Sequence, residues 1–118
     1  MIWKTSHFTD FERAALSEVV SRHHEVEHLS HQVRLAQATA RDLTGAGLYL
    51  DLKVPRSVRL IENPKNRELG GLEAVVPGLR GGIGFYLFVR DGVLSWLEAF
   101  TYQEPYPDTI EDWTWVHW

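Results

Sequence analysis

Cysteine is absent from this 118-residue chain. Its absence excludes disulfide frameworks, thiolate metal sites and cysteine nucleophiles, and it favours a reducing compartment. No apolar stretch approaches the length of a membrane span, and the N-terminus lacks a basic segment followed by an apolar run. We therefore expect a cytoplasmic protein that has no membrane partner.

Lysine and arginine are absent from residues 91–118, which hold six acidic side chains and seven of the 14 aromatic ones. Nucleic acids require clustered basic side chains, so binding to them is not expected. An acidic, aromatic segment favours a basic protein partner, because cation–π contact and area burial act together. The predicted partner-binding residues are Glu111, Asp112, Trp113, Trp115 and Trp118. The alternative is that two of the three tryptophans close the sheet against the helices.

Proline and glycine are absent from residues 1–44, which favours helix over loop. Thr9 and Glu12 have the spacing of a capping box, so a helix is predicted to begin there. Apolar residues recur at helical spacing, falter at 22–25 and resume from Val26. These features predict two helices, or one helix with a weak joint near His24. The second helix ends near Leu43, or the chain becomes extended earlier, near position 38.

The strongest signal that the chain does carry is a hairpin in residues 82–102. Asp91-Gly92 lies between two apolar, aromatic runs, and both residues tolerate the positive φ of a tight turn. Further strands are predicted at 47–54, 57–62, 71–76 and 112–118. The expected fold is a single α+β domain spanning residues 1–118. In it, an N-terminal helix pair packs on an antiparallel β-meander of five or six strands.

Two segments of the chain carry a resemblance to known sequences. Residues 41–47 read Arg-Asp-Leu-Thr-Gly-Ala-Gly, and residues 85–98 read Phe-Tyr-Leu-Phe-Val-Arg-Asp-Gly-Val-Leu-Ser-Trp-Leu-Glu. Together they resemble a family of small uncharacterised bacterial proteins, whose first segment ends in an aromatic residue where this chain has Leu48. The resemblance implies no activity, but it implies a strand entering Thr44-Gly45 and a shared role for Arg41 and Glu98. By size and acidic charge the chain is also similar to immunity proteins of toxin–immunity pairs.

Glu98 is a carboxylate in a strand that is otherwise expected in the core. It needs a cation such as Arg41 or Arg90, or a position on an open face of the sheet. Strand alternation places it on one face with Leu94, Trp96, Phe100 and Tyr102. A structural ion pair is one interpretation. The other is a ligand-binding or catalytic pocket around Arg41 and Glu98.

Three histidines, His24, His28 and His31, fall at helical spacing and are the candidates for a metal site. Such a site requires a matching second helix, which the chain does not repeat, so a solvated polar face is favoured. The glycine-rich segments 44–47 and 81–84 lack the Lys-Ser or Lys-Thr of a phosphate loop. We interpret them as strand bends or as close packing under aromatic neighbours. No metal and no cofactor are predicted.

The function predicted from the sequence is that of a non-enzymatic protein-binding module. It would be an immunity protein that neutralises a basic cognate toxin through its acidic, aromatic C-terminal surface. The alternative is a small-ligand-binding or catalytic domain with a pocket around Glu98 and Arg41. The sequence leaves a homodimer open.

Overall fold

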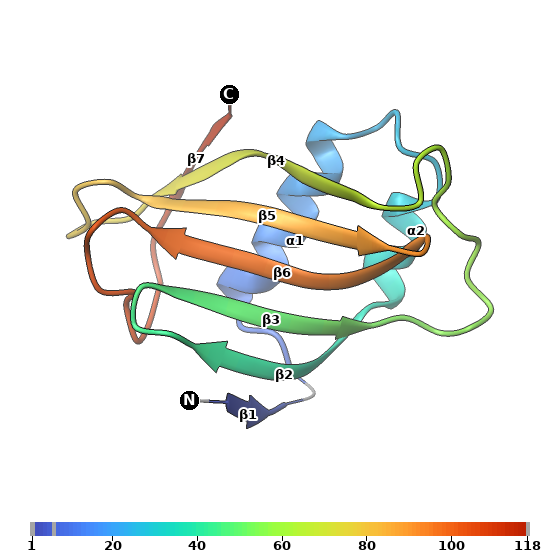
Figure 1. The fold of residues 1–118 in the computed structure, drawn as a ribbon. Coiled ribbons are helices and arrows are strands. Elements are labelled where there is room, and N and C mark those ends of the chain that lie inside the picture. Colours follow the sequence, from blue (N-terminus) through green and yellow to red (C-terminus); the bar gives the residue numbers. More distant parts are fainter. Residues whose placement is uncertain (1, 6, 118) are drawn as a thin grey trace.

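The computed structural model describes residues 2–5 and 7–117. It contains two helices, α1 (Asp10–Arg22) and α2 (Leu29–Leu35), and an antiparallel sheet. The strands are β1 (Ile2–Lys4), β2 (Gln37–Leu43), β3 (Gly47–Lys53), β4 (Arg67–Val75), β5 (Ile83–Arg90), β6 (Val93–Thr101) and β7 (Thr114–His117). Their order across the sheet is β1-β2-β3-β6-β5-β4-β7 (Figure 1). The predicted α+β class is confirmed, whereas the prediction of five or six strands is too low.

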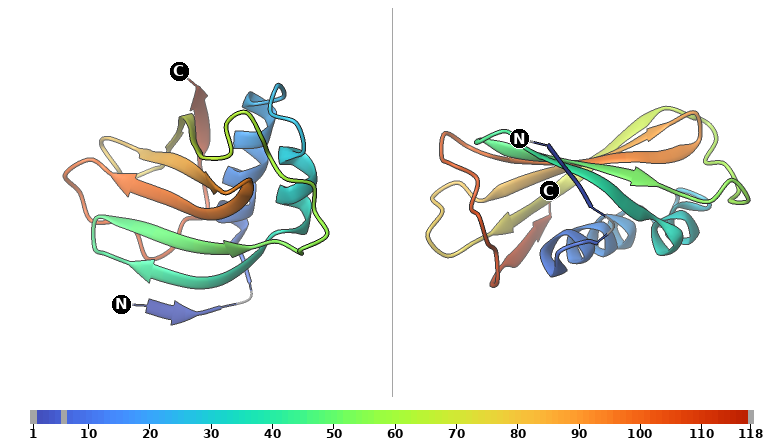
Figure 2. Two further views of the ribbon diagram at one scale, coloured as in Figure 1. Left: turned by 45° about the vertical axis from the view of Figure 1, so that its right-hand side comes forward. Right: turned by 90° about the horizontal axis from the view of Figure 1, so that it is seen from below.

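The sheet departs from a simple meander. Strands β4, β5 and β6 follow one another, but β3 pairs with β6 and not with β4. Strand β1, which the sequence analysis missed, precedes both helices and forms one edge, and β7 forms the other. Both helices lie on the same face of the sheet (Figure 2). Neither helix in the described residues is long and apolar enough to cross a membrane.

In the N-terminal region, the first helix begins where the sequence predicts, and a break separates it from the second helix. The Glu12 amide donates to the Thr9 hydroxyl at 3.1 Å, and the Thr9 amide donates to the Glu12 carboxylate at 2.9 Å, so the capping box is confirmed. The chain leaves helix at His23 and re-enters it at Leu29. The option of a second helix reaching Leu43 is wrong, because residues 37–43 pair with β3. Sheet pairing prevails here over a stripe that also fits a helix.

The central hairpin is the strand pair that the sequence predicts. Asp91 and Gly92 both have positive φ, 53° and 82°, as a tight primed turn requires. Along β5, every second residue is buried on the face that the helices cover: Ile83, Phe85, Leu87 and Val89. The Tyr86 and Phe88 side chains lie on the other face. The hairpin therefore supplies the middle of the core and also the middle of the uncovered face.

The strand predicted at 57–62 is wrong, because this segment is a loop between β3 and β4. Ile61 is nevertheless buried, and its amide donates to the Gly92 carbonyl at 2.8 Å. Gln32 of α2, which is fully buried, donates to the carbonyls of Arg59 and Gly92 and accepts from the Leu94 amide. The Gln32 side chain thus satisfies backbone groups of the loop and of the hairpin, and it links α2 to both.

Candidate functional site

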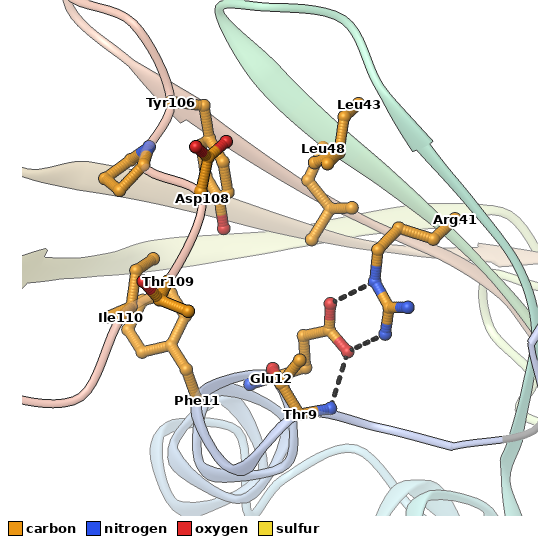
Figure 3. A pocket seen from close by; sticks show the side chains of 11 residues that line it. Thr9, Phe11, Glu12, Arg41, Leu43, Leu48, Tyr106, Asp108, Thr109 and Ile110 are labelled. Carbon is orange, nitrogen blue, oxygen red and sulfur yellow. Dashed lines mark hydrogen bonds and ion pairs between the residues drawn. The ribbon is translucent and has the colours of Figure 1, made fainter. Parts of the chain in front are cut away.

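A pocket of about 160 Å³ lies beside Arg41, between the start of α1, strands β2 and β3, and the segment 106–110 (Figure 3). Its walls are mainly apolar. The apolar lining residues are Phe11, Leu43, Leu48, Pro107 and Ile110, and the polar ones are Thr9, Glu12, Arg41, Tyr106, Asp108 and Thr109. A pocket of this size admits a ligand no larger than a single small ring.

Glu12, which is buried, and Arg41, which is partly exposed, form an ion pair at the wall of this pocket. The Arg41 Nε donates to one Glu12 carboxylate oxygen at 2.8 Å, and Nη2 donates to the other at 2.5 Å. This bond with Glu12 raises the pKa of Arg41. Because both carboxylate oxygens accept from the guanidinium and one also accepts from the Thr9 amide, Glu12 is not available as a general base. The pair joins α1 to β2.

Tyr106, which lies in the segment after β6, lines the same pocket. Burial, and secondly the nearby Glu12 carboxylate, raise the pKa of its hydroxyl well above the ordinary value, so the ring is neutral at physiological pH. The Tyr106 amide donates to the Gly45 carbonyl at 2.8 Å, and the Thr101 hydroxyl donates to the Ala46 carbonyl at 3.0 Å. These contacts pack the glycine turn between β2 and β3 against the segment after the hairpin.

Glu98 lies outside this pocket, on the opposite face of the sheet. Arg41 stands opposite Leu50, which stands opposite Leu97, and residues paired in this way share the face that the helices cover. Glu98 pairs with Tyr49 on one side and Tyr86 on the other. The structure therefore does not bring Arg41 and Glu98 together, neither as an ion pair nor as one pocket, because strand alternation turns their side chains apart.

The predicted partner-binding residues divide between core and surface. Trp113 and Trp115 are half-buried, and their ring centroids lie 5.1 and 5.9 Å from that of Phe11. Trp115 also packs edge-on against Phe85 at 5.9 Å. Glu111 and Asp112 are exposed, and Trp118 lies outside the described residues. The two described tryptophans thus close β7 against α1, as the alternative interpretation predicted.

The three candidate metal ligands are not gathered on one helix face. His24 lies in the turn after α1, His28 precedes α2 with a φ of 70°, and only His31 lies within a helix. The His31 Nδ1 is 3.2 Å from the Arg34 guanidinium. In residues 2–5 and 7–117, no three acidic or histidine side chains are grouped so that they could hold a metal ion.

No family model, no curated protein and no solved structure matches this chain.

The face of the sheet that is turned away from the helices, called the open face below, is rich in aromatic side chains. Tyr49, Tyr86 and Tyr102 expose 41%, 37% and 42% of their surface, and Phe88, Trp96 and Phe100 are half-buried. The helices lie on the other side of the sheet, and no helix covers this face in the described residues (Figure 2). An exposed aromatic patch of this kind is typical of an interaction surface.

Glycines on neighbouring strands make room for these rings, as was predicted for the segment 81–84 but not for Gly70. A Cβ atom on Gly84 would lie 2.5 Å from the Phe100 ring, and one on Gly70 would lie 2.7 Å from the Tyr86 ring. The two rings therefore occupy the space of the missing side chains and lie close to the backbone.

Carboxylates are interspersed among the rings. Glu98 lies between Tyr49 and Tyr86, and its negative charge raises the pKa of the Tyr49 hydroxyl. The pKa of Tyr102 is raised by partial burial and by the nearby Glu73. The open face therefore combines aromatic rings with negative charge at its centre.

Sequence alternation along the second hairpin arm anticipated half of this surface. It placed Trp96, Glu98, Phe100 and Tyr102 together, and the structure confirms this grouping. Leu94 is the exception, because a bulge at Ser95 shifts the register and buries Leu94 opposite Val89. Tyr49 and Glu73 also belong to this surface, but alternation within one hairpin arm does not reveal them, since their place depends on which strands are neighbours.

Proposed function

We propose that this protein is a non-enzymatic binding module that uses its open face to hold a basic protein, such as a cognate toxin that it neutralises. The observation that carries the proposal is the uncovered sheet face, where six aromatic side chains surround Glu98. Aromatic rings supply contact area and cation–π attraction, and carboxylates select positive charge. The open face, and not the C-terminal tryptophans, is thus the contact surface that we propose.

Charge supports a basic partner. The formal net charge of the chain is −4 at pH 7. The open face carries five acidic side chains, Asp42, Asp51, Glu68, Glu73 and Glu98, against three basic ones, Lys4, Lys53 and Arg90. Such a field accelerates the encounter with a cationic surface, while buried aromatic anchors slow dissociation.

The pocket beside Arg41 gives less support to a small-molecule function. The Glu12 carboxylate and the Arg41 guanidinium bind each other, and Tyr106 is a neutral phenol. The other polar residues that line the pocket, Thr9, Asp108 and Thr109, are exposed to solvent. The arrangement links α1, β2 and the segment after β6, which is a structural role.

A random peptide library displayed on phage tests the proposal and does not require the partner to be identified. The immobilised full chain should enrich peptides of net positive charge. These peptides should bind at least about tenfold more weakly to a Tyr86→Ala/Phe100→Ala variant, as expected when two aromatic anchors of roughly 1 kcal/mol or more are removed.

Glu111→Gln/Asp112→Asn is the matched control, because it removes acidic charge at the site first predicted from the sequence and leaves the open face intact. Its affinity for the selected peptides should stay near that of the wild type. The proposal is overturned if no peptide is enriched, or if the control variant loses binding and the open-face variant keeps it.

A further inference from the structure

The open face carries two stacked pairs of aromatic rings. Phe88 and Trp96 stack with centroids 4.4 Å apart and planes at 12°, and Tyr86 and Phe100 stack at 5.8 Å and 17°. Tyr86 and Phe88 are also in contact, with centroids 6.3 Å apart. The two pairs are therefore neighbours in one continuous row along strands β5 and β6.

The first pair already holds a guanidinium from the chain itself. The Arg90 Cζ lies 5.2 Å from the centroid of Phe88 and 5.2 Å from that of Trp96. Its Nη2 lies 3.0 Å from a carboxylate oxygen of Glu68, on the adjacent strand. A flat cation, two rings and one carboxylate together form a complete recognition unit.

The second pair has the same components except the cation. Glu98 stands directly opposite Tyr86, and Glu73 stands opposite Gly84, over which the Phe100 ring lies. The ring of Tyr102 extends the row, 5.5 Å from Phe100. In residues 2–5 and 7–117, no lysine or arginine forms an ion pair with Glu98 or Glu73.

We propose that this second pair, with Glu98 and Glu73, is a binding site for one arginine side chain of the partner. The inference deepens the proposed function and depends on it. The guanidinium would lie over Tyr86 and Phe100, as that of Arg90 lies over Phe88 and Trp96, and would pair with the carboxylates at either side. Arginine is favoured over lysine, because a planar guanidinium stacks on rings and binds a carboxylate with two donors, whereas an ammonium is a more strongly hydrated point charge.

The probe is Nα-acetyl-arginine methylamide, titrated into the ¹⁵N-labelled full chain and followed by NMR. We expect saturable shifts centred on Glu98, Tyr86 and Phe100. The lysine counterpart should bind about threefold more weakly or worse, and the uncharged citrulline counterpart should produce no saturable shift.

Two variants separate the new site from the occupied one. Glu73→Gln/Glu98→Gln should weaken binding of the arginine probe at least about fivefold, since both charge partners are lost. Glu68→Gln is the matched control and should leave the affinity unchanged, because Glu68 serves Arg90. Folding of each variant is checked by its amide spectrum, and Tyr86→Ala replaces the double variant if that variant fails to fold.

The outcomes distinguish this inference from the proposed function. If basic peptides from the library bind the open face but arginine and lysine probes bind equally, the arginine site is wrong and the binding module stands. Shifts confined to the Arg90 end, or shifts equal for citrulline, also overturn the site. If neither probes nor basic peptides bind the open face, both proposals fail.

Discussion

Replacing Gln32 with methionine should destabilise the protein by about 3 kcal/mol. Gln32 makes three hydrogen bonds in the core, to the Arg59 and Gly92 carbonyls at 2.7 and 2.9 Å and from the Leu94 amide at 3.0 Å. Methionine has nearly the same length and shape, so little cavity forms. The effect therefore reports on the lost polar contacts.

The size of this destabilisation depends on which hydrogen bonds each partner of Gln32 keeps after the substitution. The Leu94 amide is left buried without an acceptor, at a cost of roughly 1–3 kcal/mol, and each carbonyl loses one bond of about 1 kcal/mol. The Gly92 carbonyl keeps its bond from the Ile61 amide at 2.8 Å, which limits its loss. Burying a thioether in place of an amide returns about 1 kcal/mol. For 118 residues, a net loss of about 3 kcal/mol lowers Tm by roughly 12 °C.

Urea unfolding, followed by circular dichroism with a thermal scan beside it, measures this change. Ser30→Met is the control, because Ser30 is exposed on the same helix, and it should shift the free energy of unfolding by less than about 0.5 kcal/mol. A Gln32→Met protein within about 1 kcal/mol of wild type, with an unchanged m-value, would refute the view that Gln32 holds α2 to the hairpin.

Two further predictions concern the pocket beside Arg41. Arg41→Met should lower the free energy of unfolding in urea by about 3 kcal/mol, because Glu12 is left buried without its guanidinium. A Glu12→Met/Arg41→Met double variant should recover part of that loss. A double variant less stable than Arg41→Met would contradict the ion-pair explanation. The stabilisation linked to neutral Tyr106 should be complete below pH about 10, where the tyrosine of the unfolded chain is also protonated, and should be lost as pH rises from there toward the raised folded-state pKa. Tyr106→Phe should therefore lose stability less steeply above that pH, and identical pH profiles for the two proteins would argue against a buried neutral phenol.

Local signals were sufficient wherever the physical cause is local. The capping box at Thr9, the Asp91-Gly92 turn and the alternation along β5 depend on residues a few positions apart, and all three are as predicted. Gly84 was also anticipated as a packing partner of an aromatic ring, although not which ring it would meet, and Gly70 was not anticipated.

Features that depend on strand order were out of reach of the sequence. Arg41 and Glu98 were expected together because a resemblance linked them, but their faces follow from a register that joins β2, β3 and β6. Trp113 and Trp115 looked like surface anchors because acidic residues precede them. Their partial burial depends on the position of β7 beside α1, which local periodicity does not encode.

The strand order also has a kinetic consequence. The β2–β3 and β4–β5–β6 units form between near neighbours in the chain, but the seam between β3 and β6 joins Gly47 to Phe100. Forming such a long-range contact closes a large loop before any packing compensates for the lost chain entropy. We therefore expect two locally folded units to form early and the seam between them to limit the folding rate. Until β3 pairs with β6, Leu50 and Leu97 remain exposed to solvent, and the partly folded chain can aggregate through them.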